Sequence, residues 1–107
     1  MKLNTDGVAF GNPGPSGIGV TFRDFEGSFK LSLCQNIGNG SNFRAECLAI
    51  LEGVELAIRK GWVMLWIEAD SEPAIKAFCN DSLLWELQPR MEKLLHYTSG
   101  FHFHIDF

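Results

Sequence analysis

The sequence predicts an α/β fold, in which a mixed β-sheet is packed against helices. Three patterns lead to this prediction: apolar and polar residues alternate over the first third of the chain, apolar residues recur every third or fourth position in the middle, and a short continuous apolar segment follows. The first pattern is typical of half-buried strands, the second of an amphipathic helix, and the third of a buried parallel strand. We expect one domain over residues 1–107, because the chain contains neither a repeat nor a linker.

Five segments are expected to be strands, at residues 2–9, 18–23, 29–34, 63–67 and 101–107. In the first of them the even-numbered residues share one face and the odd-numbered residues share the other. The second and third are joined by a turn and form a hairpin. The fourth is continuously apolar, and we therefore expect both of its faces to be buried.

Two polar segments rich in glycine and asparagine flank the hairpin. Residues 10–17 include GNPGPSG, and residues 36–42 are NIGNGSN. These residue types favour turns, because glycine reaches positive φ, proline fixes its own φ, and asparagine and serine bond to nearby backbone. We therefore expect both segments to be loops.

The strongest helix is expected over residues 43–60, where an apolar stripe recurs at helical spacing. Ser41 or Asn42 can cap its start, and Gly61 can end it. This helix connects the hairpin to a parallel strand, which makes it a crossover connection within a mixed sheet.

Two shorter helices are expected after the fourth strand. Ser71 can cap the first, with Pro73 tolerated in its opening turn. Apolar residues between positions 84 and 95 mark the second, with Pro89 near its start or at a kink. The predicted order of elements is therefore β-β-β-α-β-α-α-β.

The composition excludes several classes of protein. Nine Lys and Arg against thirteen Asp and Glu give a net charge of −4, and 46% of the residues are hydrophobic. Such a chain is neither collagen-like nor disordered. The acidic balance argues against a phosphate-binding surface of the histone type, although a local basic strip can still bind nucleic acid.

The sequence gives no sign of membrane insertion or secretion. No apolar run approaches the roughly 20 residues of a membrane span, and the N-terminal residues lack the apolar core of a signal peptide. The three cysteines have no CxxC spacing, so we expect reduced and mostly buried thiols. We therefore expect an intracellular protein, in the nucleus, the cytoplasm or an organelle, with no membrane partner.

Three carboxylates occupy positions where acidic residues are uncommon. Asp6 lies inside the first strand, Glu46 lies in the first turn of the long helix, and Asp70 follows the fourth strand. Carboxylates close to a core are costly unless a positive charge compensates them, and Mg²⁺ prefers such ligands. A glutamate near a helix start and an aspartate before a short helix also have structural explanations. The residues alone leave both interpretations open.

Two further patterns have simpler explanations. His102, His104 and Asp106 would share one face of the last strand and could hold a metal, but a solvated face of an edge strand is the favoured interpretation. The tryptophans are expected to pack in the core or between helices rather than to stack on bases. They are Trp62, Trp66 and Trp85.

Four segments together resemble the ribonuclease H family, and most of all the reverse-transcriptase-derived domains of plant retroelements. They are Asn4-Thr5-Asp6-Gly7, the glycine-rich residues 11–19, Asn42-Phe43-Arg44-Ala45-Glu46 and Glu68-Ala69-Asp70-Ser71. The resemblance covers the whole chain. It implies a five-stranded mixed sheet in which the first, fourth and fifth strands are parallel. It also implies a metal-dependent endonuclease that hydrolyses the RNA strand of RNA/DNA hybrids with two Mg²⁺ or Mn²⁺ ions.

The resemblance also assigns roles to residues. Asp6, Glu46 and Asp70 match three acidic metal ligands of the family and are the expected catalytic residues. The expected contacts to the hybrid are Gly7, Asn12, Ser41, Asn42 and Arg44. Arg44 is expected to be structural or to face a phosphate. Short polar side chains and loop amides suit a wide, shallow minor groove that displays 2′-hydroxyl groups.

The sequence departs from the family in two places. Phe43 stands where relatives commonly carry a second asparagine, which removes one minor-groove hydrogen bond. The chain ends at Phe107, before the closing helix and the fourth acidic ligand of the family, so we expect a domain that is C-terminally truncated relative to the family. These departures leave a second function open, a catalytically degenerate module of retroelement origin that binds nucleic acid or a partner. We also expect self-association through the uncovered apolar face of the last strand.

Overall fold

The computed structural model describes residues 1–79, 87–97 and 102–106. The elements are β1 (Lys2–Ala9), β2 (Gly14–Arg23), β3 (Phe29–Gly40), α1 (Asn42–Lys60), β4 (Met64–Ala69), α2 (Glu72–Cys79), α3 (Gln88–Tyr97) and β5 (His102–Asp106). The predicted order of strands and helices is confirmed. None of the helices in the described part of the chain is both long and apolar enough to span a bilayer.

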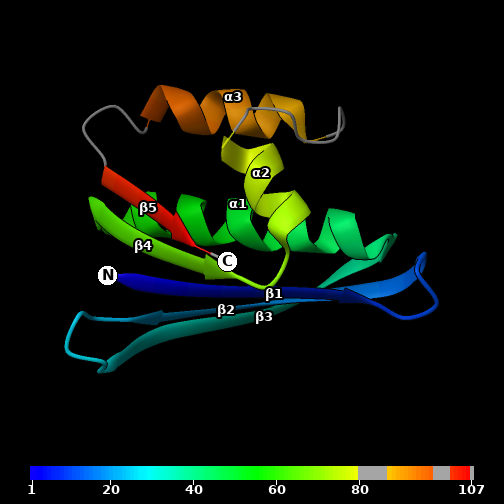
Figure 1. Ribbon diagram of the computed structural model, residues 1–107, viewed down its shortest axis with the longest axis horizontal. Coiled ribbons are helices and arrows are strands. Elements are labelled where there is room, and N and C mark those ends of the chain that lie inside the picture. The colour runs from blue at the N-terminus through cyan, green and yellow to red at the C-terminus, as the bar shows by residue number, and fades with distance from the viewer. Residues whose placement is uncertain (80–86, 98–101, 107) are drawn as a thin grey trace.

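The strands form one five-stranded mixed sheet in the order β3-β2-β1-β4-β5. β1 pairs with β2, and β2 with β3, in antiparallel fashion, whereas β1 and β5 both run parallel to β4. This is the arrangement that the ribonuclease H resemblance implied. The three helices lie on the same side of the sheet, with α1 next to it and α3 farthest from it (Figure 1).

The core lies between α1 and the sheet face that it covers. Leu3, Phe22 and Ile67 are fully buried on that face and pack against the buried stripe of α1. The alternation predicted for β1 is confirmed, because its odd-numbered residues are buried and its even-numbered residues face outward. We call the outward side, which Asn4, Asp6 and the other even-numbered residues of β1 share, the open face.

The prediction that β4 is buried on both faces is wrong. Leu65 and Ile67 are buried, but Met64 and Trp66 are 56% and 39% exposed. They lie on the open face, over which none of the described helices packs. The ring of Trp66 packs there against that of His104, tilted by 42° with the centroids 4.0 Å apart, so Trp66 is not the core residue that we expected. Trp62 does pack as predicted, 4.9 Å from the ring of Phe22.

The two glycine-rich segments are not simple loops, which corrects the sequence prediction. β2 begins at Gly14 and β3 extends to Gly40, and the two segments pair with each other across positions such as Gly14 with Gly40. A shift in register between Ser16 and Gly17 accommodates the irregular residues. Each segment alone favours turns, but their mutual hydrogen bonding extends the hairpin and brings Asn42 beside the end of β1.

The helix boundaries follow the predicted capping residues. Ser41 accepts a hydrogen bond from the Arg44 N–H at 3.0 Å, and Gly61 adopts the left-handed conformation, φ 73°, that ends α1. Ser71 caps α2 in the same way through the Ala74 N–H. Pro89 lies in the first turn of α3, while the predicted start of that helix at residues 84–86 lies outside the described residues.

Two predictions concern residues at the chain's surface. Cys47 is buried, but Cys34 and Cys79 are exposed, so the expectation of mostly buried thiols is wrong; all three are free. The apolar residues predicted to drive self-association are Phe101, Phe103, Ile105 and Phe107 of the last strand. Ile105 is half-buried and packs on the core, while Phe101, Phe107 and the side chain of Phe103 lie outside the described residues. Self-association therefore stays a prediction.

Candidate metal and nucleic-acid site

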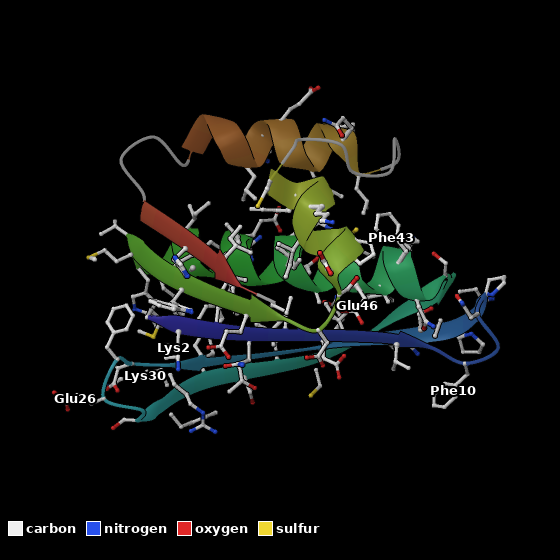
Figure 2. All side chains as sticks on the ribbon, in the orientation of Figure 1. Lys2, Phe10, Glu26, Lys30, Phe43 and Glu46 are labelled. Carbon is white, nitrogen blue, oxygen red and sulfur yellow. The ribbon has the colours of Figure 1, made fainter. Side chains whose placement is uncertain are left out.

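Asp6, Glu46 and Asp70 come from three elements that meet where β4 ends. β4 pairs with β1 only as far as Ala69 opposite Thr5, and Asp70 follows directly. Beyond Thr5, none of the strands in the described part of the chain therefore pairs with β1 on that side. The carboxyl end of β4 and the first turns of α1 border this gap, and Figure 2 shows Glu46 reaching from α1 toward the sheet there.

Glu46 is the most perturbed of the three carboxyl groups. Its Oε2 is buried and has no hydrogen-bond partner, while the carboxylate accepts a hydrogen bond from the Gly7 N–H. Burial and, to a smaller extent, the negative charges of Asp6 and Asp70 together raise the pKa of Glu46 to about 7, against the opposing effect of the Gly7 bond. Glu46 is thus close enough to Asp6 and to Asp70 for their negative charges to act on its carboxylate.

The three groups do not converge on a single point. Asp6 lies on the open face of the sheet, whereas Glu46 approaches from the side that α1 covers. Asp70 is common to both sides, since it lines one cavity with Asp6 and another with Glu46. Among the described residues, no three His, Cys, Asp or Glu side chains are gathered tightly enough to hold an ion as they stand.

The donor set nevertheless fits a hard divalent cation. A buried carboxylate oxygen without a partner is costly, and two further negative charges next to it increase that cost. A cation bound between these oxygens would remove both penalties, and Mg²⁺ and Mn²⁺ prefer oxygen ligands. The nearby carboxylate of Glu68 differs, because it already has partners within the protein. Lys2 Nζ lies 3.7 Å from Glu68 Oε1, and the Asn4 side-chain amide donates a hydrogen bond to Glu68 Oε2 at 3.3 Å.

Asn12 and Asn42 form a hydrogen-bonded link between the β1–β2 connection and α1. The Ala9 N–H donates to Asn42 Oδ1 at 2.6 Å, and the Asn42 N–H donates to Asn12 Oδ1 at 2.9 Å. Both asparagines line the cavity that also contains Glu46 and Asp70. Two of the residues predicted to contact the hybrid therefore lie next to the candidate metal ligands.

The other three residues predicted to contact nucleic acid have structural roles. Gly7 is buried beneath the first turns of α1, and Ser41 caps that helix. The Arg44 guanidinium donates to the Ile37 carbonyl oxygen at 3.3 Å, which ties α1 to the end of β3. Arg44 thus has a structural role, which is one of the two roles that we expected for it. Contacts of these three residues with nucleic acid stay predictions.

The role of Gly7 was not foreseen from the sequence. A glycine inside an alternating strand pattern signals close approach of another backbone, and this signal was present directly after Asp6. Nor was it foreseen that Phe43, Ser71 and Pro73 line the same cavity as Glu46. For the last strand a solvated face was favoured over a metal site at His102, His104 and Asp106. His104 is exposed and its ring packs against that of Trp66, while the side chains of His102 and Asp106 lie outside the described residues.

Sequence comparison relates the chain to one family and to several curated proteins. The reverse transcriptase-like family matches residues 4–104. A ribonuclease H protein of Arabidopsis thaliana is 36% identical over 72 residues, and ribonuclease HI of Haemophilus ducreyi is 42% identical over 56 residues. Ribonuclease H of Ruegeria pomeroyi is 30% identical over 102 residues.

The coverage of these relatives is partial. The matches include 67%, 52% and 77% of this chain, respectively, and 12%, 35% and 66% of the lengths of the relatives. The chain therefore spans less than two thirds of each curated relative.

Solved structures share the fold over nearly the whole chain. RNase H1 of Halobacterium salinarum superposes with a TM-score of 0.82 at 23% identity, covering 98% of this chain and 82% of that one. LC11-RNase H1, isolated from compost, gives a TM-score of 0.76 at 28% identity, covering 97% and 82%. The same LC11 protein in complex with an RNA/DNA hybrid gives a TM-score of 0.79 at 24% identity, covering 98% and 82%. The predicted five-stranded fold is thereby confirmed.

Proposed function

Because the chain belongs to the reverse transcriptase-like family of ribonuclease H domains, we propose that it hydrolyses the RNA strand of RNA/DNA hybrids with the help of Mg²⁺ or Mn²⁺. The observation that carries this proposal is the environment of Glu46. Its buried oxygen lacks a partner, and the charges of Asp6 and Asp70 repel it. An arrangement that is unfavourable without a cation is favourable with one.

Asp6, Glu46 and Asp70 would hold the cations. When bound, such ions activate a water molecule and stabilise the leaving oxygen of a phosphodiester. The protein's own contribution is to hold the carboxylates in place beside one another. The Gly7 N–H fixes one oxygen of Glu46, and the position of Asp70 after β4 gives its side chain access to the cavities on both sides.

Recognition of the hybrid would use the polar groups beside these carboxylates. Asn12 and Asn42 line the cavity that contains Glu46 and Asp70, and short polar side chains suit a groove that displays 2′-hydroxyl groups. Phe43 also lines this cavity and offers an apolar surface in place of a hydrogen-bond donor. LC11-RNase H1, a protein of the same fold, has been crystallised with an RNA/DNA hybrid, which supports this class of ligand.

A second candidate is a module that binds nucleic acid without cleaving it. The observation that favours it is the spacing of the carboxylates, since no three acidic side chains of the described residues are gathered as an ion would require. Cleavage would therefore need the carboxylates to move together when metal and substrate bind. A binding module needs no such movement.

A substrate panel separates the two candidates. Oligonucleotides of one sequence are prepared as RNA/DNA hybrid, duplex DNA and duplex RNA, each with one labelled strand, which is the RNA strand in the hybrid, and are incubated with the chain and Mg²⁺ or Mn²⁺. The proposed enzyme cleaves the RNA of the hybrid and leaves both other duplexes intact. Binding of the hybrid without cleavage at any metal concentration would instead establish the module, and neither binding nor cleavage would exclude both.

A further inference from the structure

Gly7 and the first turns of α1 approach each other more closely than any side chain would permit. A Cβ atom placed on Gly7 would lie 2.4 Å from the Ala45 carbonyl carbon, 2.5 Å from its oxygen and 2.6 Å from the Glu46 nitrogen. All three atoms belong to the helix backbone, so no side-chain rotation can relieve the overlap. The absence of a side chain at Gly7 thus sets the distance between β1 and α1 at this point.

The start of α1 is anchored in this position by separate contacts. The Ala9 N–H bonds to the Asn42 side chain at 2.6 Å, and the Arg44 guanidinium bonds to the Ile37 carbonyl oxygen at 3.3 Å. One anchor holds the helix to β1, and the other holds it to β3. A larger residue at position 7 could not push the whole helix away without straining these bonds. The backbone of α1 around Glu46 would therefore have to shift locally.

The backbone of Gly7 also contacts the Glu46 side chain directly. Its N–H donates a hydrogen bond to the Glu46 carboxylate. This N–H is available because β4 ends opposite Thr5 and leaves β1 unpaired on that side. Gly7 therefore influences Glu46 in two ways. Its close contact with the helix sets the position of the Glu46 backbone, and its N–H group orients the Glu46 carboxylate through the hydrogen bond.

We propose that Gly7 is a positioning residue for divalent-metal binding, which brings Glu46 within reach of Asp6 and Asp70. This inference rests on the proposed function, because it concerns the same three carboxylates. It goes beyond that function by assigning the alignment of the site to a residue that neither binds metal nor carries a side chain.

The first experiment measures Mn²⁺ binding by calorimetry in the absence of substrate. Gly7→Ala is compared with Gly17→Ala, a matched control in β2 whose added Cβ would meet only the Gln35 carbonyl oxygen, at an ordinary 3.5 Å. Because outer contacts of metal ligands typically change affinity by about 10–100-fold, we expect at least about a tenfold loss for Gly7→Ala. We expect less than about a twofold change for Gly17→Ala. Equal Mn²⁺ affinities of a folded Gly7→Ala variant and the wild type would overturn the proposal.

The second experiment needs neither metal nor a folded Gly7 variant. The amide resonances of the metal-free wild type are compared with those of Glu46→Gln above the Glu46 pKa of about 7, where a neutral amide oxygen replaces an ionised carboxylate. A hydrogen bond to a charged acceptor is stronger, so the Gly7 amide proton should move upfield in the variant, and by more than that of Gly17. A Gly7 shift no larger than that of Gly17 would overturn the proposal.

The two experiments distinguish failure of the inference from failure of the proposed function. If the wild type binds no Mn²⁺, the proposed metal-dependent function fails and the positioning of a metal ligand fails with it, whatever the Gly7 amide shows. If the wild type binds Mn²⁺ and Gly7→Ala binds it equally well, the function stands and only the role of Gly7 is overturned.

Discussion

The side chain of Asn42, at the start of α1, accepts a hydrogen bond from the backbone N–H of Ala9, at the end of β1, over 2.6 Å. The same residue's N–H donates to Asn12 in the β1–β2 connection. Ala9 is buried, so no water can replace this acceptor at low cost. One asparagine therefore joins the strand that carries Asp6 to the helix that carries Glu46.

Asn42→Ala should destabilise the protein by about 1–3 kcal/mol, because it leaves the buried Ala9 N–H without an acceptor. Urea unfolding measures the effect. Asn39→Ala is the matched control, since Asn39 is exposed in β3 and should change stability by less than about 0.5 kcal/mol. Equal stability of the two variants would show that the Ala9 bond contributes nothing.

Glu46→Gln should stabilise the metal-free protein at alkaline pH. Unfolded glutamate loses its proton near pH 4.5, while folded Glu46 keeps it to about pH 7. The folded state therefore binds more protons between these values, and wild-type stability falls as the pH rises through this window. Glutamine cannot ionise, so the variant escapes this fall.

We expect the Glu46→Gln variant to be more stable than the wild type by about 1–2 kcal/mol near pH 8, because solvent screening reduces the effect of the shift at a half-buried group. The difference should shrink toward pH 4.5, where both side chains are neutral. Urea unfolding in the presence of a chelator, repeated across this range, gives the comparison. A stability difference that does not vary with pH would contradict the assigned environment of Glu46.

Arg90→Met should loosen the packing of α3 on α1. The Arg90 guanidinium bonds to Glu52 at 2.8 Å and to Glu55 at 2.7 Å, and both carboxylates are mostly buried. Because the substitution leaves two such charges without a partner, we expect a loss of about 1.5–3 kcal/mol. Thermal unfolding measures it.

Lys76→Ala provides the control for Arg90→Met. Lys76 pairs with Glu72 at 3.1 Å on the exposed surface of α2, where such a pair contributes about 0.5 kcal/mol or less. If the two variants unfold at the same temperature, the link between α3 and α1 is as weak as an exposed ion pair.

Much of the fold could be predicted because its signals are local. Alternation in β1 fixed which residues face α1, and Ser41 and Gly61 marked the ends of that helix. Pairing between distant segments is not a local signal. The glycine-rich residues after position 14 and before position 40 favour turns individually, yet they form strands because they bond to each other. Likewise, burial on both faces of β4 depends on which elements cover the sheet.

The sequence predicted which residues form the candidate site but not how they are arranged. The positions of Asp6, Glu46 and Asp70 within their elements pointed to a shared site. Alternation in β1 placed Asp6 on one face of the sheet, but how closely α1 brings Glu46 to β1 depends on the contact at Gly7, which is not a local signal. Nor could the bond between Asn42 and Ala9 be predicted, because it joins residues 33 positions apart through side-chain geometry.

The proposed activity is tested most directly by the rate at which the chain cleaves the labelled RNA strand of an RNA/DNA hybrid in Mg²⁺. Asp70→Asn is compared with Glu26→Gln, which also removes one negative charge but lies in the β2–β3 turn, at the other end of the sheet (Figure 2). We expect the wild type and Glu26→Gln to cleave equally, and Asp70→Asn to be at least about 100-fold slower. Cleavage by Asp70→Asn at the wild-type rate, or no cleavage by the wild type at any Mg²⁺ or Mn²⁺ concentration, would contradict the proposed metal-dependent hydrolysis.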